Sequence, residues 1–354
     1  MTKVLIGEIS SYKAMVIAKY LFKQYPDIEI YTFDYFSFTG KIHSKYSAKH
    51  FVLKFTTVES YIVQISELVK KLCIDLFIPV HSDFIEDILK QRKLFGSTLS
   101  YIGNYSTYKL LHNKKDLHSL ARKLAINVPI EYEDYRSAKI PFVAKPSNKS
   151  SSKGVLYIND AASFERYKNY NFNNYVFQEY VEGIGCGYSI YCADGEIIKS
   201  YGHKRLAEYP VTGGSSVYRD FFYVPEMKEI TKKILAEVKW TGFAMFEFKC
   251  KKNGELVLIE VNPRIWGSIN QGQQNGVNYF ESLIGETTIV NTPNKSYKTY
   301  LSPQVYLSLA KYILKGKTKP LLLFLKNFKN NKADVNLFDD FKGYFSVILR
   351  FFYK

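Results

Sequence analysis

Acidic and amide side chains gather near the end of a strand pair between residues 242 and 262. The first strand carries Glu247 between two phenylalanines. The second strand carries Glu260 and Asn262 two positions apart, so their side chains share one face. The tight turn at Asn253-Gly254 is expected to bring Glu247 and Glu260 side by side. Two carboxylates in an apolar sheet are costly without a cation, so the pattern predicts that Glu247, Glu260 and Asn262 hold Mg²⁺ through hard oxygen ligands.

Arg264 follows the second strand directly after Pro263 and is expected to reach the same site. Its guanidinium keeps its charge and binds two phosphate or carboxylate oxygens at once. The alternative is a solvated hairpin with an ordinary salt bridge. This interpretation is the weaker one, because the run Glu-x-Asn-Pro-Arg after a hairpin is uncommon by chance. The four residues together predict a site for Mg²⁺ and a nucleotide phosphate, with activation of an acid.

The composition limits the classes of protein and partner. The chain has 354 residues, 46% of them hydrophobic, a formal net charge of +16 and a pI near 9.3. This length predicts two or three subdomains. The charge favours nucleotides, acidic substrates, nucleic acid or an anionic membrane surface, and a merely lysine-rich solvated surface explains it equally well. No RRM, KH or helix-turn-helix signature accompanies the charge, so we expect no nucleic acid partner.

The cysteine pattern and the apolar runs predict a cytoplasmic protein. We expect the four cysteines to be reduced because no C-x-x-C spacing is present. No signal-peptide pattern precedes the first predicted strand. The longest apolar run of the C-terminal part, Leu321 to Leu325, is too short to span a bilayer.

Strands and helices alternate in the first hundred residues. The strands are expected at 3–9, 28–33 and 76–80, and the helices at about 11–24 and 57–72. This order predicts a doubly wound α/β unit. The dinucleotide fingerprint G-x-G-x-x-G is absent from it.

The middle and end of the chain have different patterns. A helix is predicted over 106–125, and a small α+β lid with several short strands is predicted over 142–203. Residues 303–354 are rich in lysine and aromatic residues with helical spacing. This segment is predicted to pack on the enzyme core, the favoured interpretation, or to lie on a membrane surface.

Five motifs occur in the order in which the ATP-grasp superfamily has them, and the chain resembles that family over most of residues 1–285. The motifs are Asn113-Lys114-Lys115-Asp116 with Ala125-Ile126-Asn127-Val128-Pro129, Phe142-Val143-Ala144-Lys145-Pro146, Ser150-Ser151-Ser152-Lys153-Gly154-Val155, Gln178-Glu179-Tyr180-Val181-Glu182-Gly183, and the hairpin residues Glu247, Glu260, Asn262 and Arg264. The resemblance is greatest to predicted carboxylate–amine ligases with a carbamoyl-phosphate-synthase-like ATP-grasp domain.

This resemblance implies a mixed α/β and α+β protein with the ATP-grasp fold. A doubly wound pre-ATP-grasp domain would precede a small lid subdomain and a C-terminal antiparallel-sheet core. The implied divisions are the pre-ATP-grasp domain at 1–108, a linker helix and the start of ATP-grasp at 109–141, the lid at 142–203, the core with the metal site at 204–290, and a basic, aromatic helical extension at 291–354.

The resemblance also implies the residues that bind ATP. Lysines at the family's positions would contact the α- and β-phosphates, a flexible loop would contact the β- and γ-phosphates, and a hinge would contact adenine through its backbone. The family usually has an acidic residue after the hinge glycine, whereas this chain has Gly185-Cys186-Gly187, so Glu182 is the predicted ribose ligand. The ATP-binding residues are Lys114, Lys145, Ser150, Ser151, Ser152, Lys153, Gly154, Glu179, Tyr180, Val181 and Glu182.

Basic residues near the γ-phosphate complete the predicted site. Arg264, Lys204 and Arg205 are the predicted catalytic residues, and His203 is disfavoured as a base because a lone histidine is more often packed or solvated. The predicted substrate-binding residues are Arg219, Gly267 and Ser268.

The implied function is ATP-dependent ligation, with Mg²⁺, or Mn²⁺ in its place, as the metal. A substrate carboxylate would become an acyl phosphate and then react with an amine, releasing ADP and phosphate. The alternatives are a bicarbonate-activating carboxylase or carbamoyl-phosphate-type enzyme and a non-catalytic nucleotide-binding module. The expected partners are a small carboxylate and a small amine, and the patterns leave peripheral membrane contact through the C-terminal segment and oligomerisation open.

Overall fold

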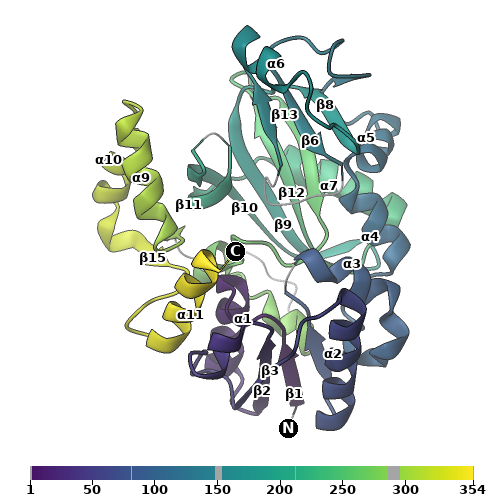
Figure 1. The fold of residues 1–354 in the computed structure, drawn as a ribbon, viewed down its shortest axis with the longest axis vertical. Coiled ribbons are helices and arrows are strands. Elements are labelled where there is room, and N and C mark those ends of the chain that lie inside the picture. Colours follow the sequence, from purple (N-terminus) through teal and green to yellow (C-terminus); the bar gives the residue numbers. More distant parts are fainter. Residues whose placement is uncertain (1, 81, 148–153, 212, 286–295, 354) are drawn as a thin grey trace.

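The protein contains three β-sheets, which the computed structural model describes through residues 2–80, 82–147, 154–211, 213–285 and 296–353 (Figure 1). Two sheets have four strands each, and the third has seven. The mixed α/β and α+β architecture confirms the predicted fold class. No helix in these ranges is both long and apolar enough to cross a lipid bilayer.

The N-terminal sheet is parallel, with strand order β3-β2-β1-β4. Its strands are apolar and its helices turn apolar faces towards it, which confirms the predicted alternation. The short strand β3 was not predicted from the sequence. The elements are β1 (Thr2–Ile6), α1 (Tyr12–Gln24), β2 (Ile28–Asp34), β3 (Lys49–Val52), α2 (Val58–Leu72), β4 (Leu76–Ile78) and α3 (Ser82–Lys90).

Two helices stand where one was predicted over 106–125. The helix α4 (Tyr105–His112) ends before Asn113, and α5 (Lys114–Lys123) begins after it. The Asn113 side chain caps α5 by accepting hydrogen bonds from the backbone N–H groups of Lys115 and Asp116. This cap fixes the position of Lys114 at the start of α5.

The second four-stranded sheet has the order β5-β8-β6-β7 and packs on an aromatic cluster that includes Tyr135, Phe142 and Phe177. It stands at the top of Figure 1, away from the N-terminal sheet. Its elements are β5 (Glu131–Tyr132), β6 (Phe142–Pro146), β7 (Leu156–Ile158), α6 (Ala161–Tyr167) and β8 (Tyr175–Glu179).

The seven-stranded sheet has the order β13-β12-β9-β10-β11-β14-β15 and forms the body of the molecule. We expected residues 142–203 to form one lid, but β9 and the whole of β10 belong to this larger sheet. Each residue of β12 pairs with β9, and this pairing satisfies backbone groups that a free hairpin edge would expose. The elements are β9 (Ile184–Ala193), β10 (Glu196–Tyr209), β11 (Ser215–Phe221), α7 (Pro225–Val238), β12 (Gly242–Cys250), β13 (Leu256–Asn262) and α8 (Ile269–Gln274).

The C-terminal segment adds two strands and three helices, although the sequence predicted only helices. The strands β14 (Lys298–Tyr300) and β15 (Asn331–Ala333) extend the large sheet beyond β11. The remaining elements are α9 (Gln304–Leu314), α10 (Lys319–Lys326) and α11 (Phe341–Phe352), with short 3₁₀ helices at Ser37–Gly40, Arg92–Leu94, Gly96–Leu99, Phe280–Leu283 and Phe328–Asn330.

The inner faces of the C-terminal helices pack on the rest of the protein. Val305 and Leu309 of α9 join a buried cluster with Tyr218 of β11. The helix α11 lies beside α1 (Figure 1), and its Arg350 donates a hydrogen bond of 3.0 Å to the hydroxyl of Ser10. These contacts confirm that the segment packs on the core.

Candidate active site

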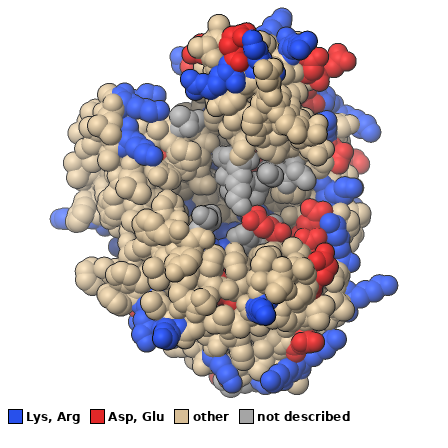
Figure 2. All heavy atoms as spheres, viewed as in Figure 1, with Lys and Arg blue, Asp and Glu red and all other residues tan. Residues whose placement is uncertain are grey.

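A cavity of about 620 Å³ lies where residues of the second four-stranded sheet face the large sheet. Its volume falls within the range typical of small-molecule sites. Lys145 of β6 and the segment 179–181 line it from one sheet, and Glu247 and Glu260 line it from the other. The face drawn in Figure 2 is hollowed near its middle.

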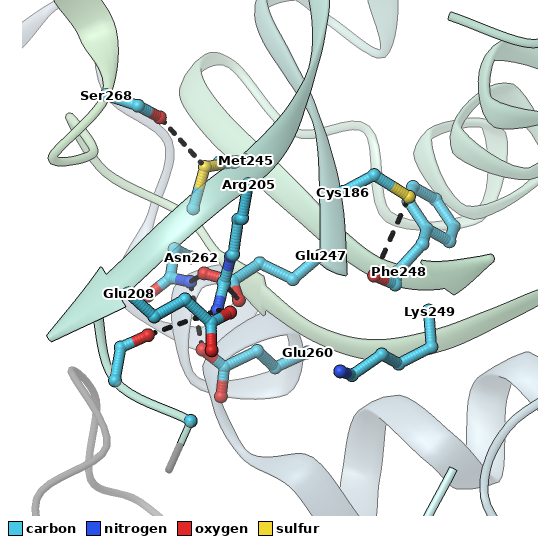
Figure 3. A network of polar contacts seen from close by, with 12 residues as sticks. Cys186, Arg205, Glu208, Met245, Glu247, Phe248, Lys249, Glu260, Asn262 and Ser268 are labelled. Atoms are coloured by element: carbon cyan, nitrogen blue, oxygen red, sulfur yellow. Dashed lines mark hydrogen bonds and ion pairs between the residues drawn. The ribbon is translucent and has the colours of Figure 1, made fainter. Parts of the chain in front are cut away.

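The two predicted carboxylates stand together in this cavity. Glu247 of β12 pairs directly with Glu260 of β13 in the strand register. Asn262 donates one amide hydrogen bond to each carboxylate, at 3.1 Å to Glu247 and 3.2 Å to Glu260. Figure 3 shows the three side chains pointing toward one another.

Two cations from distant parts of the chain hold these carboxylates. Arg205 of β10 forms an ion pair with Glu247 and a second one, of 3.1 Å, with Glu208 (Figure 3). The ammonium of Lys114 lies 3.3 Å from Glu260. The cap at Asn113 places Lys114 here, and that side chain is almost completely buried.

The surroundings shift the acidities of this group in different directions. Burial raises the pKa of Glu260, but the charges of Lys114 and Lys145 outweigh that cost and lower the pKa to about 2. Burial holds the pKa of Glu247 above its usual value, against the opposing effect of Arg205. Burial also lowers the pKa of Lys145 to about 8, although Glu260 acts to raise it.

The donor set suits Mg²⁺. Among the residues that the structure describes, no group of three or more His, Cys, Asp or Glu side chains could hold a metal ion. The cluster offers instead two carboxylates, and Mg²⁺ commonly binds through one or two carboxylates while retaining waters. The Asn262 amide presents its nitrogen to the glutamates and its oxygen to Arg264, so a half-turn of the amide group would add its oxygen to the metal ligands. Glu247, Glu260 and Asn262 therefore fit a magnesium ion that also contacts phosphate.

A second, smaller cavity of about 90 Å³ lies on the other side of the carboxylates. Arg205, Glu247 and Glu260 line both cavities, so the two meet at this cluster. The remaining lining residues come from the first helix, from the strands β10, β11 and β12, and from the segment after β13; they include Tyr12, Lys13, His203, Ser215, Ser216, Met245, Arg264, Gly267 and Ser268.

Arg264 and Lys13 are the basic residues that this small cavity does not share with the larger one. Arg264 is buried and donates hydrogen bonds to the side-chain oxygen of Asn262 at 2.7 Å and to the backbone oxygen of Ile265 at 3.0 Å. Its Nε is buried and has no hydrogen-bond partner among the described residues. Lys13 donates a hydrogen bond of 2.9 Å to the backbone oxygen of Val80. Burial, with the nearby charge of Arg264, lowers the pKa of Lys13 well below its usual value.

Lys13 is a cavity residue that was not predicted from the sequence. The position of Lys13 in the first turn of a helix that follows a parallel strand was the available signal, because ligands of α/β folds gather at this edge.

Lys204 was predicted to act in catalysis, but its side chain lines neither cavity. The adjacent residue His203 lines the small cavity instead. Side chains alternate along β10, so His203 and Arg205 point one way and Lys204 points the other. The Lys204 ammonium lies 5.8 Å from the centre of the Phe222 ring. His203 is buried, its Nε2 lies 3.2 Å from the hydroxyl of Ser268, and burial lowers its pKa to about 3.

Arg219 was predicted to bind substrate, but it lines neither cavity. It is buried and forms an ion pair with the equally buried Asp334. It also donates a hydrogen bond of 3.3 Å to the backbone oxygen of Gly267. Arg219 therefore supports the loop under the small cavity, whereas Gly267 and Ser268, which were also predicted, line that cavity.

The predicted hinge divides into residues that line the large cavity and one that does not. Glu179, Tyr180 and Val181 line it. The carboxylate of Glu179 accepts a hydrogen bond of 3.2 Å from the backbone N–H of Ile130. Glu182, the predicted ribose ligand, is exposed and outside the cavity lining.

The predicted phosphate loop is only partly described. Ser150, Ser151, Ser152 and Lys153 lie outside the described residues. Gly154 has φ of +75°, a conformation that favours glycine. Its backbone oxygen accepts a hydrogen bond of 3.0 Å from the hydroxyl of Tyr175.

Further lysines that the sequence analysis missed reach the large cavity. Lys249 of β12 lines it and donates a hydrogen bond of 3.3 Å to the backbone oxygen of Gly183. Lys315 and Lys317, from the turn after α9, line it as well. Together with Lys114 and Lys145, they give the cavity a basic lining suited to phosphate groups.

A family model of known proteins matches the part of the chain that holds the candidate site. Residues 111–268 match the family model of the ATP-grasp domain. This range contains Lys114, Lys145, the carboxylate pair and Arg264. That part of the chain is therefore similar to the ATP-grasp domain, in agreement with the resemblance that the sequence motifs indicate.

Individual relatives resemble larger parts of the chain. A D-alanine–D-alanine ligase from Aquifex aeolicus (strain VF5) is 26% identical over 209 residues, which cover 53% of this chain and 70% of that protein. The structure of the biotin carboxylase domain of Hydrogenobacter thermophilus 2-oxoglutarate carboxylase, in complex with MgADP, ADP and bicarbonate, matches with a TM-score of 0.66 at 13% identity, over 83% of this chain and 72% of that one. An L-amino acid ligase from Bacillus licheniformis matches with a TM-score of 0.59 at 16% identity, over 77% of this chain and 69% of that one. At these identities the two structural likenesses concern the fold.

Proposed function

We propose that this protein is an ATP-dependent ligase that activates a carboxylate as an acyl phosphate and couples it to an amine, releasing ADP and phosphate. The observation that carries this proposal is that the two cavities share Glu247, Glu260 and Arg205. A nucleotide in the larger cavity and an acid in the smaller one would meet at that cluster. The similarity to a D-alanine–D-alanine ligase supports the same class of reaction.

The nucleotide would lie along the large cavity. Its adenine would contact the backbone at 179–181, and its phosphates would contact the ammonium groups of Lys114 and Lys145. Glu247, Glu260 and Asn262 would hold Mg²⁺. When bound, Mg²⁺ neutralises charge on the phosphate oxygens and holds them in line for transfer.

The acid would occupy the small cavity, with its carboxylate between Arg264 and Lys13. One carboxylate oxygen attacks the γ-phosphorus, the bond from that phosphorus to the β–γ bridging oxygen breaks, and ADP leaves. An amine then attacks the acyl carbon, loses a proton and expels inorganic phosphate. Arg264 would stabilise the negative charge that develops on the carboxyl oxygen, and Arg205 would stay beside the transferred phosphoryl group.

An ADP-release screen tests this proposal. The protein with Mg-ATP is incubated with pairs of amino acids or sugar acids and amines, and the products are identified by mass spectrometry. The expected result is ADP release that requires both an acid and an amine, with a product that lacks one water relative to the pair. ATP binding without ADP release for any pair would instead support a non-catalytic nucleotide-binding module.

A bicarbonate-activating enzyme is the second candidate. The fold similarity to a biotin carboxylase domain favours it, and a cavity of about 90 Å³ would admit so small an acid. ADP release that depends on bicarbonate and needs no added amine or other acid would support this candidate over the ligase.

A further inference from the structure

The helical pair formed by α9 and α10 exposes many large apolar side chains. Leu314 is 85% exposed and Phe328, just after α10, is 72% exposed. Isolated exposed apolar residues are ordinary, but a concentration of them marks an interaction surface. The apolar members of this surface, called the α9–α10 patch, are Tyr306, Leu307, Ile313, Leu314, Leu322, Leu325 and Phe328.

The patch is the outer face of a packed structure. The inner faces of the two helices are buried through Val305 and Leu309 of α9 and Phe324 of α10. The Phe324 ring lies 5.2 Å from that of Tyr218 in β11. Because these contacts fix the helices to the large sheet, the outer side chains are presented by an ordered scaffold.

The same stretch of chain is strongly basic. From Gln304 to Ala333 the sequence has seven lysines and no acidic residue. The lysines of the two helices and the turns beside them, among them Lys319, Lys326 and Lys329, are exposed next to the apolar side chains. Figure 2 shows basic side chains on the lobe that these helices form at the left.

We propose that the α9–α10 patch docks the protein on an anionic membrane surface. Exposed leucine and phenylalanine side chains would enter the boundary of the acyl chains, and the lysines around them would bind the lipid phosphates. A second copy of this chain is a poorer occupant, because the same positive charges would face one another. This inference does not depend on the ligase reaction.

The position of the patch also has a consequence for access to the large cavity. Lys315 and Lys317, in the turn between α9 and α10, line that cavity as well as belonging to the basic stretch. Docking would therefore bring the rim of the cavity close to the lipid headgroups.

Vesicle sedimentation tests the proposal with the full chain. We expect the protein to sediment with vesicles of equal parts phosphatidylglycerol and phosphatidylcholine, but not with vesicles of phosphatidylcholine alone. Added salt should weaken the binding, because it screens the lysine charges. Equal sedimentation with both vesicle types, or none with either, would overturn the proposal.

Two variants with the same change in net charge distinguish binding through the α9–α10 patch from a general attraction between a basic protein and an anionic membrane. Lys326→Glu/Lys329→Glu reverses charges on the patch, whereas Lys232→Glu/Lys233→Glu reverses charges on α7, which lies on the opposite side of the molecule (Figure 1). We expect the patch variant to bind at least about tenfold more weakly and the α7 variant to lose much less. Equal losses in the two variants would refute a defined docking face.

The apolar contribution has its own test. Leu322→Ser/Leu325→Ser should reduce binding that persists at high salt, while Val63→Ser in α2, also an exposed apolar position, should leave it unchanged. Thermal melting checks that each variant is folded. If sedimentation velocity instead shows an oligomer that the Leu322→Ser/Leu325→Ser variant dissociates, and the vesicles bind nothing, the patch joins copies of this chain and the membrane proposal fails.

Discussion

Glu247 and Glu260 stand directly opposite each other across the β12–β13 hairpin, and each is paired with a cation from a distant element. Arg205 of β10 holds Glu247, and Lys114 of α5 holds Glu260. The chain thus brings two carboxylates and two cationic side chains to the point where its two cavities meet. Changes at this point should affect chemistry far more than folding.

Glu260→Gln should abolish turnover in a protein that remains folded. The substitution keeps the shape of the side chain but removes a charge that would bind Mg²⁺, so we expect ADP release to fall at least about a hundredfold. Circular dichroism and thermal melting would verify the fold. Glu255→Gln, on the same hairpin near its turn, is the matched control and should keep full activity. Undiminished ADP release by the Glu260 variant would refute the metal-site assignment.

ADP affinity should fall as the pH rises above about 8. The pKa of Lys145 is lowered to about 8, so above that pH the free protein has lost the lysine proton that phosphate binding requires. Affinity should therefore decrease by up to about tenfold per pH unit. Isothermal titration calorimetry on either side of this pH measures the effect.

Lys145→Arg provides the control for this pH dependence. Arginine retains its charge throughout the range, so the decrease attributed to Lys145 should disappear in the variant. Lys252→Arg, at the exposed hairpin turn, should behave as the wild type. An unchanged profile in the Lys145→Arg protein would show that another group causes the pH dependence.

Arg219→Leu should destabilise the protein by about 3–5 kcal/mol, because it leaves the Asp334 carboxylate buried without its cation. The double variant Arg219→Leu/Asp334→Leu should recover part of the loss. Urea denaturation measures both free energies of unfolding. A stable Arg219→Leu protein with a raised KM would restore the original interpretation of Arg219 as a substrate ligand.

Lys13→Met should raise the KM for the acid by roughly tenfold or more, since it removes a hydrogen-bond donor from the small cavity. The KM for ATP should change little, because Lys13 does not line the large cavity. Steady-state kinetics with an acid from the ADP-release screen checks both values. Lys23→Met, at the exposed end of the same helix, is the control, and equal effects of the two substitutions would contradict a role for Lys13 in acid binding.

The hairpin of the candidate site was predictable from sequence because its determinants are local. The Asn253-Gly254 turn fixes the strand register, and the period of two then determines which side chains share a face. The structure accordingly pairs Glu247 with Glu260. The segment 179–181 was found through the resemblance to the ATP-grasp superfamily, and it lines the large cavity.

Other parts of the site depend on relationships that no local pattern contains. Arg219 finds its partner Asp334 at a separation of 115 residues, so its charge was read as available to a substrate. Lys204 and Arg205 are adjacent in sequence, and only the register of β10 decides which of them faces the cavity. Strands of three residues, such as β14 and β15, are too short to show a period.

The strands β14 and β15 are synthesised long after β11, so they join the large sheet late. Until the ribosome has made residues 298–334, the outer edge of β11 has no neighbour and Arg219 has no Asp334 to neutralise it. At about 5–20 residues per second, the unfinished domain waits for several seconds with an open strand edge. That interval is when the nascent chain is most open to pairing with another chain, so a chaperone that shields β11 would act during translation rather than after release.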